Sequence, residues 1–196
     1  MIYFKNSAAR LFYAIFFVLI LVACGNDDDE ELPTFPPTNR GDIQANRLKI
    51  TFILSQDTTQ KATYEFYDPD GIGGNAPIVI DTIKLLKPLG ATRQYKSSIV
   101  IYNDSTSLNE AIKEKDNRYI ICYRGMNTSN LRFGDPNLDR DGQPLGIEAT
   151  WSTIDVQGSS DSGNIRITMN FQPATKDGTC DPGSRILEAI MPYVVI

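Results

Sequence analysis

The chain has 196 residues, of which 41% are hydrophobic and 22% charged, and its formal net charge is −5. It contains no histidine, which excludes Ser-His-Asp and Cys-His catalysis and histidine-ligated zinc sites. Three cysteines are too few for a thiolate zinc site if one of them is modified, and the sequence has no Gly-rich phosphate loop followed by Lys and Ser or Thr.

Residues 1–23 have the pattern of a signal peptide. Lys5 and Arg10 give it a positive start, and the 13-residue apolar run Leu11–Ala23 follows. This run is short for a membrane-spanning helix, which needs about 20 residues. It ends in Leu21-Val22-Ala23-Cys24-Gly25, which resembles the lipobox of bacterial lipoproteins. We therefore expect cleavage before Cys24 and acylation of its thiol, for example with palmitate; an uncleaved anchor with an incidental cysteine is the alternative.

The segment after Cys24 has the composition of a tether. Asn26–Glu31 is an acidic block, and Leu32–Gln44 is rich in Pro, Thr and polar residues. We expect residues 24–45 to form a lipidated cysteine and an extended, disordered spacer. The acidic block is either a solvated spacer or an export signal, since it resembles the signal that sends Bacteroidetes lipoproteins to the outer face of the outer membrane. Surface display is the favoured interpretation.

Cleavage would also make the chain more acidic. Without residues 1–23, the remaining 173 residues hold 17 Lys and Arg against 24 Asp and Glu, a net charge of −7. Nucleic acids and anionic membrane surfaces attract clustered cations, so this charge argues against both as partners. A length of 173 residues suits one domain with a hydrophobic core.

Residues 46–196 have the period-two pattern of β-strands with one buried face. The alternation is clearest in Leu48–Leu54, Ala62–Phe66 and Ile165–Phe171. Pro192 should place part of the last strand at an edge or a bulge. Five weaker candidates bring the expected total to eight strands: Ile78–Leu86, Gln94–Asn103, Arg118–Arg124, Ile147–Val156 and Arg185–Ile196.

One short helix is expected after residue 107. Ser107 and Glu110 match a capping box, and Leu108, Ala111 and Ile112 provide an apolar face. This helix would join two strands across the sheets. The strand pattern predicts an all-β fold, a Greek-key β-sandwich with an immunoglobulin-like form as one version. A closed barrel is the alternative, because alternation is the same in both.

Two cysteines remain if Cys24 carries lipid. Cys122 lies in a predicted strand, and Cys180 lies in a Gly- and Asp-rich loop. Two cysteines in an exported domain usually pair, so we expect a Cys122–Cys180 disulfide. The alternative is a buried Cys122 that packs as a small hydrophobic residue, with Cys180 free.

Two acidic loops are candidate calcium sites. In Asp135–Gly142 and its continuation, Asn137, Asp139, Asp141 and Glu148 have the spacing of positions 1, 3, 5 and 12 of an EF-hand loop, and Gly142 stands at position 6. The flanking segments read as strands, and Pro144 stands at position 8, so a polar turn between strands is the alternative. Asp68 and Asp70, in the loop Asp68–Pro77, are the weaker candidates.

The chain also resembles a family of small Bacteroidetes lipoproteins, many of them uncharacterised, that are often encoded beside TonB-dependent outer-membrane receptors. The resemblance runs through Phe66–Pro77, Ile101–Ser105 and Asp139–Gly146 and covers most of residues 46–171. Gly73-Gly74-Asn75-Ala76-Pro77 is its most specific element. The Cys180 loop and Ile186–Ile196 depart from the family pattern. The resemblance implies a surface accessory protein of nutrient uptake.

Three functions therefore compete. The first is a surface lipoprotein that binds a nutrient together with a TonB-dependent receptor. The second is a structural or adhesive surface module without a small ligand. The third is a hydrolase that uses two carboxylates. No pair of acids stands out in the sequence, so the expectation is that the chain is not an enzyme. An aromatic-lined cleft would favour the first function, an exposed sheet edge the second, and facing carboxylates the third.

Overall fold

The computed structural model describes residues 43–196, except 89, 91, 127–128, 157–160 and 174–175. The predicted signal peptide, Cys24 and the tether up to residue 42 lie outside the described residues. Among the described residues, no helix is long and apolar enough to span a membrane. Ile43 and Ala45, which the sequence placed in the tether, are buried in the core. The packed domain therefore includes residues before Asn46, which was the expected boundary.

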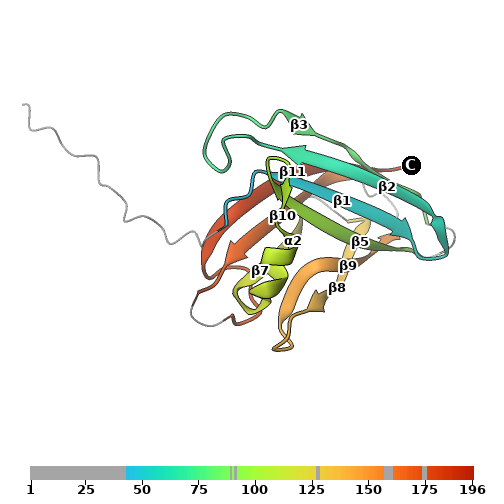
Figure 1. Cartoon of the computed structure of the whole chain (residues 1–196). Helices are drawn as coiled ribbons and strands as arrows, with labels where there is room; N and C mark the ends of the chain where they lie inside the picture. The colour runs from blue at the N-terminus through green and yellow to red at the C-terminus, as the bar shows by residue number, and fades with distance from the viewer. Residues whose placement is uncertain (1–42, 89, 91, 127–128, 157–160, 174–175) are drawn as a thin grey trace, which may run out of the picture. The chain divides into compact units, whose positions relative to one another are not determined.

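The domain is an all-β sandwich of two separate sheets (Figure 1). The larger sheet has the order β3-β2-β1-β5-β9-β8, with β6 paired to β5, and the smaller has the order β4-β11-β10-β7. Two separate sheets exclude the closed barrel. The strands are β1 (Arg47–Leu54), β2 (Asp57–Tyr67), β3 (Val79–Ile80), β4 (Ile83–Leu85), β5 (Thr92–Asn103), β6 (Thr106–Ser107), β7 (Tyr119–Met126), β8 (Leu131–Leu138), β9 (Pro144–Ile154), β10 (Ser162–Phe171) and β11 (Ser184–Val195).

Alternating side chains from both sheets build the core. Every second residue of β1 is buried, as the sequence pattern predicted. Trp151 of β9 lies at the centre of an aromatic cluster, with ring centroids 5.1 Å from Phe52, 5.0 Å from Tyr123 and 4.7 Å from Phe133. Its indole N–H donates to Ser97 Oγ at 2.7 Å, which satisfies its one buried polar group.

The strand prediction was incomplete in two places. Ile78–Leu86 is divided between β3 in the larger sheet and β4 in the smaller, because the chain crosses the sandwich between Ile80 and Ile83. Asp135–Leu138, interpreted as loop, belongs to the edge strand β8. Gly134, Asp135 and Pro136 disfavour strands, and the pairing of β8 with β9 is correspondingly irregular around Pro136. Together with the short β6, these changes raise the strand number from eight to eleven in the described residues.

The predicted short helix is present as α2 (Asn109–Glu114), between β6 and β7 of opposite sheets, and the short 3₁₀ helix η1 (Asp116–Arg118) follows it. The predicted capping box is absent: Leu108 is the N-cap residue, no side chain caps the helix, and Ser107 ends β6. The Asn109 amide instead holds the helix start to β5, where Nδ2 donates to Ile99 O and Oδ1 accepts from Ile101 N–H, at 2.8 and 2.9 Å.

The last strand differs from a simple edge strand. β11 pairs with β10 along most of its length, and its other side pairs in parallel with β4 only at Tyr193–Val195. Pro192 lies just before this parallel segment. Among the described residues, the part of β11 from Arg185 to Pro192 therefore has a strand partner on one side only, and Pro192 lies in this edge portion as predicted.

Candidate functional site

The four residues predicted to bind calcium in the second loop do not all lie in a loop. Asn137 lies in β8, Asp139 and Asp141 lie in the turn that follows, and Glu148 lies within β9. Asn137 Oδ1 accepts the Glu148 N–H at 2.8 Å, so these two residues bridge the strands of a hairpin. Gly142 adopts a φ of +79°, the left-handed conformation that the turn requires.

Asp139 is the centre of this turn. Its Oδ1 accepts the N–H groups of Asp141 and Gln143, at 2.9 and 2.8 Å. Its Oδ2 lies 2.8 Å from Lys176 Nζ, and the two side chains are only 0% and 2% exposed. Burial acts to raise the pKa of Asp139, but the hydrogen bonds from Lys176 and Gln143 outweigh it, so the pKa lies below its usual value.

A second ion pair fastens the same turn to α2. The Arg140 side chain pairs through Nε with Asp116 Oδ1, and its Nη2 donates to the carbonyl of Glu114 at 2.7 Å and to that of Lys113 at 3.2 Å. The Arg140 N–H also donates to Asp116 Oδ2 at 3.1 Å. The turn thus bridges the β8–β9 hairpin and the end of the helix.

These contacts favour the polar-turn alternative for the second loop. Both carboxylate oxygens of Asp139 already have donors, and one of those donors is a buried cation. Within the described residues, no three Cys, Asp or Glu side chains gather as a metal site would require. Calcium binding at Asn137, Asp139, Asp141 and Glu148 stays a prediction.

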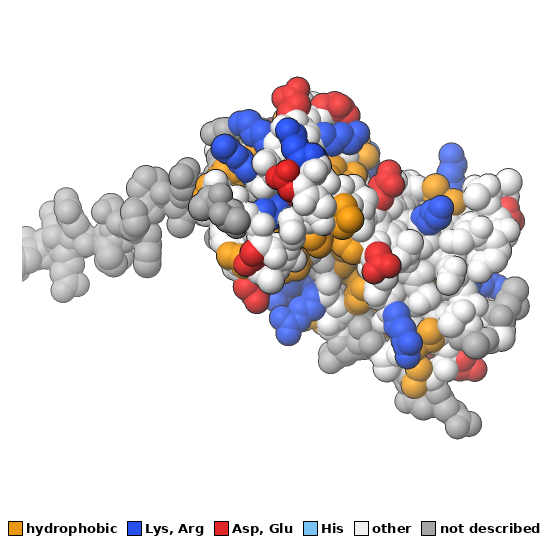
Figure 2. Space-filling view, turned by 90° about the horizontal axis from the view of Figure 1, so that it is seen from below, with side chains coloured by type: hydrophobic (Ala, Val, Ile, Leu, Met, Phe, Trp, Pro, Cys, Tyr) orange, Lys and Arg blue, Asp and Glu red, His pale blue; other side chains and the backbone are white. Residues whose placement is uncertain are grey.

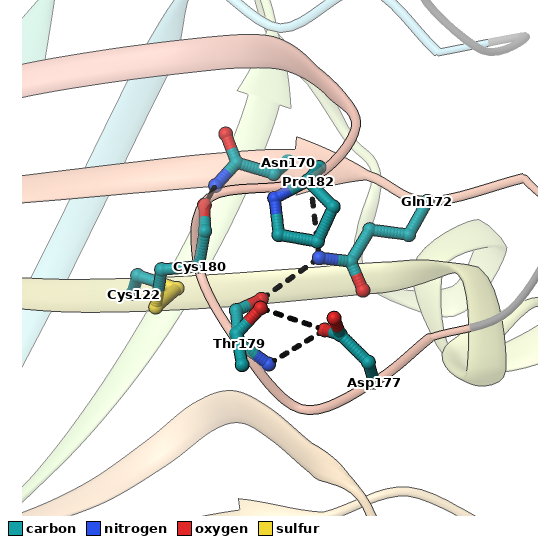
Figure 3. The surroundings of a disulfide bond; sticks show 7 residues. All are labelled: Cys122, Asn170, Gln172, Asp177, Thr179, Cys180 and Pro182. Carbon is teal, nitrogen blue, oxygen red and sulfur yellow. Dashed lines mark hydrogen bonds between the residues drawn. A yellow bond between two sulfur atoms is a disulfide. The ribbon is translucent and has the colours of Figure 1, made fainter.

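The expected Cys122–Cys180 disulfide is present, with the two Cα atoms 6.0 Å apart (Figure 3). It joins β7 to the loop before β11. Side chains of β10 and the residue that follows hold this loop: Asn170 Nδ2 donates to Cys180 O at 2.8 Å, and Gln172 Nε2 donates to Thr179 O at 2.8 Å and Pro182 O at 3.0 Å. The loop is therefore built into the domain by one covalent bond and several amide contacts.

The first acidic loop is organised around Asp70. The backbone N–H and the Nδ2 of Asn75 both donate to Asp70 Oδ2 at 2.7 Å, and these bonds lower the pKa of Asp70. A Cβ on Gly74 would lie 2.4 Å from the Asp70 carboxyl, so only glycine fits there. Gly74 and Asn75 thus pack around one carboxylate, while Gly73 adopts the positive φ of +89° that the turn requires.

Asp68 lies against Asp70, so the structure brings the two weaker metal candidates together. Asp68 is only 8% exposed, and within the described residues its buried Oδ1 has no hydrogen-bond partner. Burial raises the pKa of Asp68, and the hydrogen bond and negative charge of Asp70 raise it further. A proton held between the two carboxyl groups would relieve the repulsion between their charges, and a bound cation would do the same.

A polar cavity of about 380 Å³ lies beside this loop, where β1 begins and β5 ends. Asn46 organises it: its Nδ2 donates to Asp104 Oδ1, and its Oδ1 accepts the Asp104 N–H, both at 2.8 Å. This pair holds Asp104 at a φ of +53°. Asp70 and Asp104 both line the cavity, together with the polar residues Gln44 and Asn103 and the apolar residues Ile43, Ile72 and Ile186.

A second hollow, which we call the β3 groove, is also lined by Ile72. Its walls are mainly apolar, and two acids complete them: Phe66, Asp68, Ile72, Gly73, Pro77, Ile80, Glu188 and Ile190. Glu188 is neutralised by Arg166 at 3.1 Å and by Arg185 at 2.7 Å.

On the underside of the Figure 1 view, charges of both signs are interspersed around hydrophobic side chains (Figure 2).

The three functional expectations can be compared with this geometry. Trp151 itself is buried, but Phe52 of the aromatic cluster and the neighbouring Tyr95 line a hollow on the larger sheet. β3 provides an exposed sheet edge, and Asp70 and Asp104 share one cavity. No protein-family model matches the chain, and no curated protein matches it either.

Sequence reasoning missed Asn46, Asp104 and Lys176. Asn46 and Asp104 are 58 residues apart, and Lys176 and Asp139 are 37 apart. No local pattern links such pairs, since each depends on how the strands meet. The exposed aliphatic run Ile78-Val79-Ile80 was a usable signal, because a strand with three consecutive apolar residues is either doubly buried or exposed at an interface.

Proposed function

We propose that this chain is an exported lipoprotein, anchored to the outer membrane through Cys24 and displayed on the cell surface, where it binds a ligand as an accessory component of TonB-dependent nutrient uptake. The Cys122–Cys180 disulfide supports export, because such bonds persist in oxidising compartments. The lipobox-like Leu21–Cys24 segment supports the anchor. The resemblance to receptor-associated lipoproteins supports the role in uptake.

The polar cavity is the observation that carries the binding function. It is preformed, since the Asn46–Asp104 pair and the Asp70–Asn75 contacts fix its walls. Its carboxylates and amides are hydrogen-bonding groups of the kind that orient a small polar ligand. We propose no catalytic step, and calcium at Asp68 and Asp70 of the first acidic loop is the one cofactor that the structure leaves room for.

A structural or adhesive surface module is the second candidate. The exposed edge of β3, with apolar side chains, favours it, because such edges pair with other chains. The two candidates differ in the cavity. Substituting Asn103 with Trp should obstruct the cavity and abolish nutrient-dependent growth if the cavity binds the ligand, while an adhesive module should lose nothing.

The anchor is tested by metabolic labelling with palmitate and by membrane fractionation. We expect the wild type to be labelled and Cys24→Ala to be unlabelled, and to be retained as precursor or released in soluble form. Protease treatment of intact cells should remove the wild-type domain if it is displayed outside. Equal labelling of Cys24→Ala contradicts the anchor, and full protection from protease contradicts surface display.

A further inference from the structure

We infer that the edge of β3 and the adjoining β3 groove bind an extended, apolar segment of a partner protein that carries Lys or Arg. The segment would add a strand to the larger sheet beside β3, with its apolar side chains against the exposed isoleucines. This inference rests on the proposed function only for the location of the partner, in the same membrane. The surface itself is argued from the described domain.

The first argument is the gathering of exposed apolar side chains. Eight large hydrophobic side chains are exposed in the described part of the chain, and five of them lie in β3, beside it, or in the β3 groove. Their exposed fractions run from 36% to 67%: Ile72, Ile78, Val79, Ile80 and Ile190. Scattered exposed aliphatic residues need no explanation, but a group of this kind is typical of a protein–protein contact.

The second argument is the state of the sheet edge. β3 is the outermost strand of the larger sheet, at the top of Figure 1, and pairs only with β2 among the described strands. The opposite edge strand, β8, contains Asp135 and Pro136, and its pairing is irregular there. Charges, prolines, bulges and very short edge strands are the features that block edge-to-edge pairing. β8 has a charge, a proline and an irregular pairing within the strand, whereas β3 has only its shortness.

The third argument is charge. Asp68, Asp70 and Asp81 lie in or beside the segment that carries the exposed isoleucines, and none of them has an ion pair among the described residues. Asp81 Oδ2 accepts the Glu65 N–H at 2.8 Å, which fixes its carboxylate at the end of β3. Glu188, the other acid of the β3 groove, differs from these aspartates because it already has cationic partners. A segment with Lys or Arg at its ends would therefore complement this surface.

The chain length before the domain indicates which partners can reach this surface. Ile43, where the described chain begins, lines the polar cavity together with Ile72, and Ile72 also lines the β3 groove. Residues 25–42 can span at most about 60 Å when fully extended. If Cys24 is lipidated, the surface stays within that reach of the bilayer, where a membrane-embedded receptor would present its segments.

Peptide binding tests the surface without a membrane. The full mature chain in detergent is titrated into a fluorescein-labelled peptide, Lys-Thr-Val-Lys-Val-Thr-Val-Lys-Thr, and anisotropy is measured. The matched probes replace every Lys with Glu, or the central Val with Pro. We expect saturable binding of the basic peptide and at least tenfold weaker binding of both matched probes. Binding of the acidic peptide with equal affinity, or no binding of the basic one, overturns the inference.

Two variants locate the contact. Ile80→Asp adds negative charge, so electrostatics alone would strengthen binding of the basic peptide, whereas loss of the apolar contact should weaken it at least tenfold. The matched control is Leu138→Asp, at a 59% exposed apolar residue of the opposite edge strand β8, and it should bind like the wild type. Thermal melts of both variants confirm folding. Equal weakening by both variants contradicts a site at β3.

A photo-crosslinking residue at position 80 then tests the partner in cells, with position 138 as control. We expect a crosslink to an outer-membrane protein from position 80 only. A crosslink to a second copy of the chain, together with dimerisation in sedimentation that Ile80→Asp abolishes, would overturn the inference in favour of self-association. If palmitate labelling fails while the peptide binds, the anchor is wrong and the surface stands.

Discussion

Lys176 Nζ lies 2.8 Å from Asp139 Oδ2, and both side chains are almost fully buried. Lys176 Nζ also donates to the carbonyl of Asp116 at 3.0 Å. One ammonium group therefore joins the β8–β9 turn, the 3₁₀ helix η1 and the loop that carries Cys180. The pair has excellent geometry, and three regions of the chain depend on it.

Removing one charge of this pair should be costly. Lys176→Met leaves Asp139 as a buried, uncompensated carboxylate, and we expect a loss of about 3–5 kcal/mol in the free energy of unfolding. The double variant Lys176→Met, Asp139→Asn removes both charges and keeps an oxygen for the N–H groups of Asp141 and Gln143, so it should recover part of the loss. Urea denaturation measures each value. Additive losses in the double variant would contradict the coupling.

The same pair should contribute to acid unfolding. Because the pKa of Asp139 is lower in the folded chain than its usual value, its contribution to stability is complete above the usual Asp pKa of about 3.9 and is lost as the pH falls through the lower folded value. We expect Asp139→Asn to flatten the fall in stability below about pH 4. Denaturant midpoints measured from pH 7 to pH 2 test this, and an unchanged slope would contradict it.

Asp68 should show the opposite pH dependence. Its folded pKa is raised by burial and by Asp70, so its favourable contribution is complete below the usual Asp pKa and is lost as the pH rises through the folded value. Asp68→Asn should therefore be more stable than the wild type at pH 7, by about 1 kcal/mol, and should lose this advantage near pH 3. A loss of stability at pH 7 that appears only with calcium present would instead indicate a bound cation.

Calcium should not stabilise the chain through the second loop, because the ammonium group of Lys176 already neutralises the Asp139 carboxylate. We expect no rise in melting temperature from this loop at millimolar calcium, measured by calorimetry. If the loop did bind calcium, the wild type would melt higher, since a ligand of the native state stabilises it by mass action. Asp139→Ala and Glu148→Ala would then remove that rise, while the exposed control Asp155→Ala would keep it.

The disulfide should carry a large share of the stability. Cys122 and Cys180 close a loop with a sequence separation of 58, which corresponds to about 4 kcal/mol in the chain-entropy estimate. Cys122→Ala with Cys180→Ala should lose this amount. In the Cys24→Ala chain, unfolded without reductant, no thiol should react with Ellman's reagent, and two should react after reduction. Free thiols before reduction would contradict the bond in solution.

Local patterns in the sequence were sufficient for the strands of the core. The alternation of β1 and β10, the short helix and the cysteine pairing follow from period, length and compartment, and all are present. The β8 strand was missed because Gly134, Asp135 and Pro136 disfavour strands, while pairing with β9 overrides that preference. The capping box was a wrong prediction in the opposite direction: it was expected and is absent. Ser107 instead belongs to β6 and pairs with Tyr102 of β5 before the helix begins.

The candidate site was harder to predict than the fold. The glycines and acids of the two loops predicted where the chain turns. The roles of Asp70 and Asp139, however, depend on partners elsewhere in the chain. The Asn46–Asp104 pair forms only when the residue before β1 meets the β5–β6 turn. The EF-hand spacing predicted convergence on an ion, while the hairpin register places Asn137 and Glu148 as neighbours in two strands.

β11 lies between β4 and β10 and follows every other described strand in the sequence. During synthesis, β4 and β10 have no shared partner until β11 emerges, so the smaller sheet cannot close before then. Long-range pairing of this kind forms late. If the chain is exported as proposed, a chain that meets the export machinery before β11 emerges does so with its smaller sheet still incomplete. The strand order therefore makes completion of the smaller sheet depend on β11.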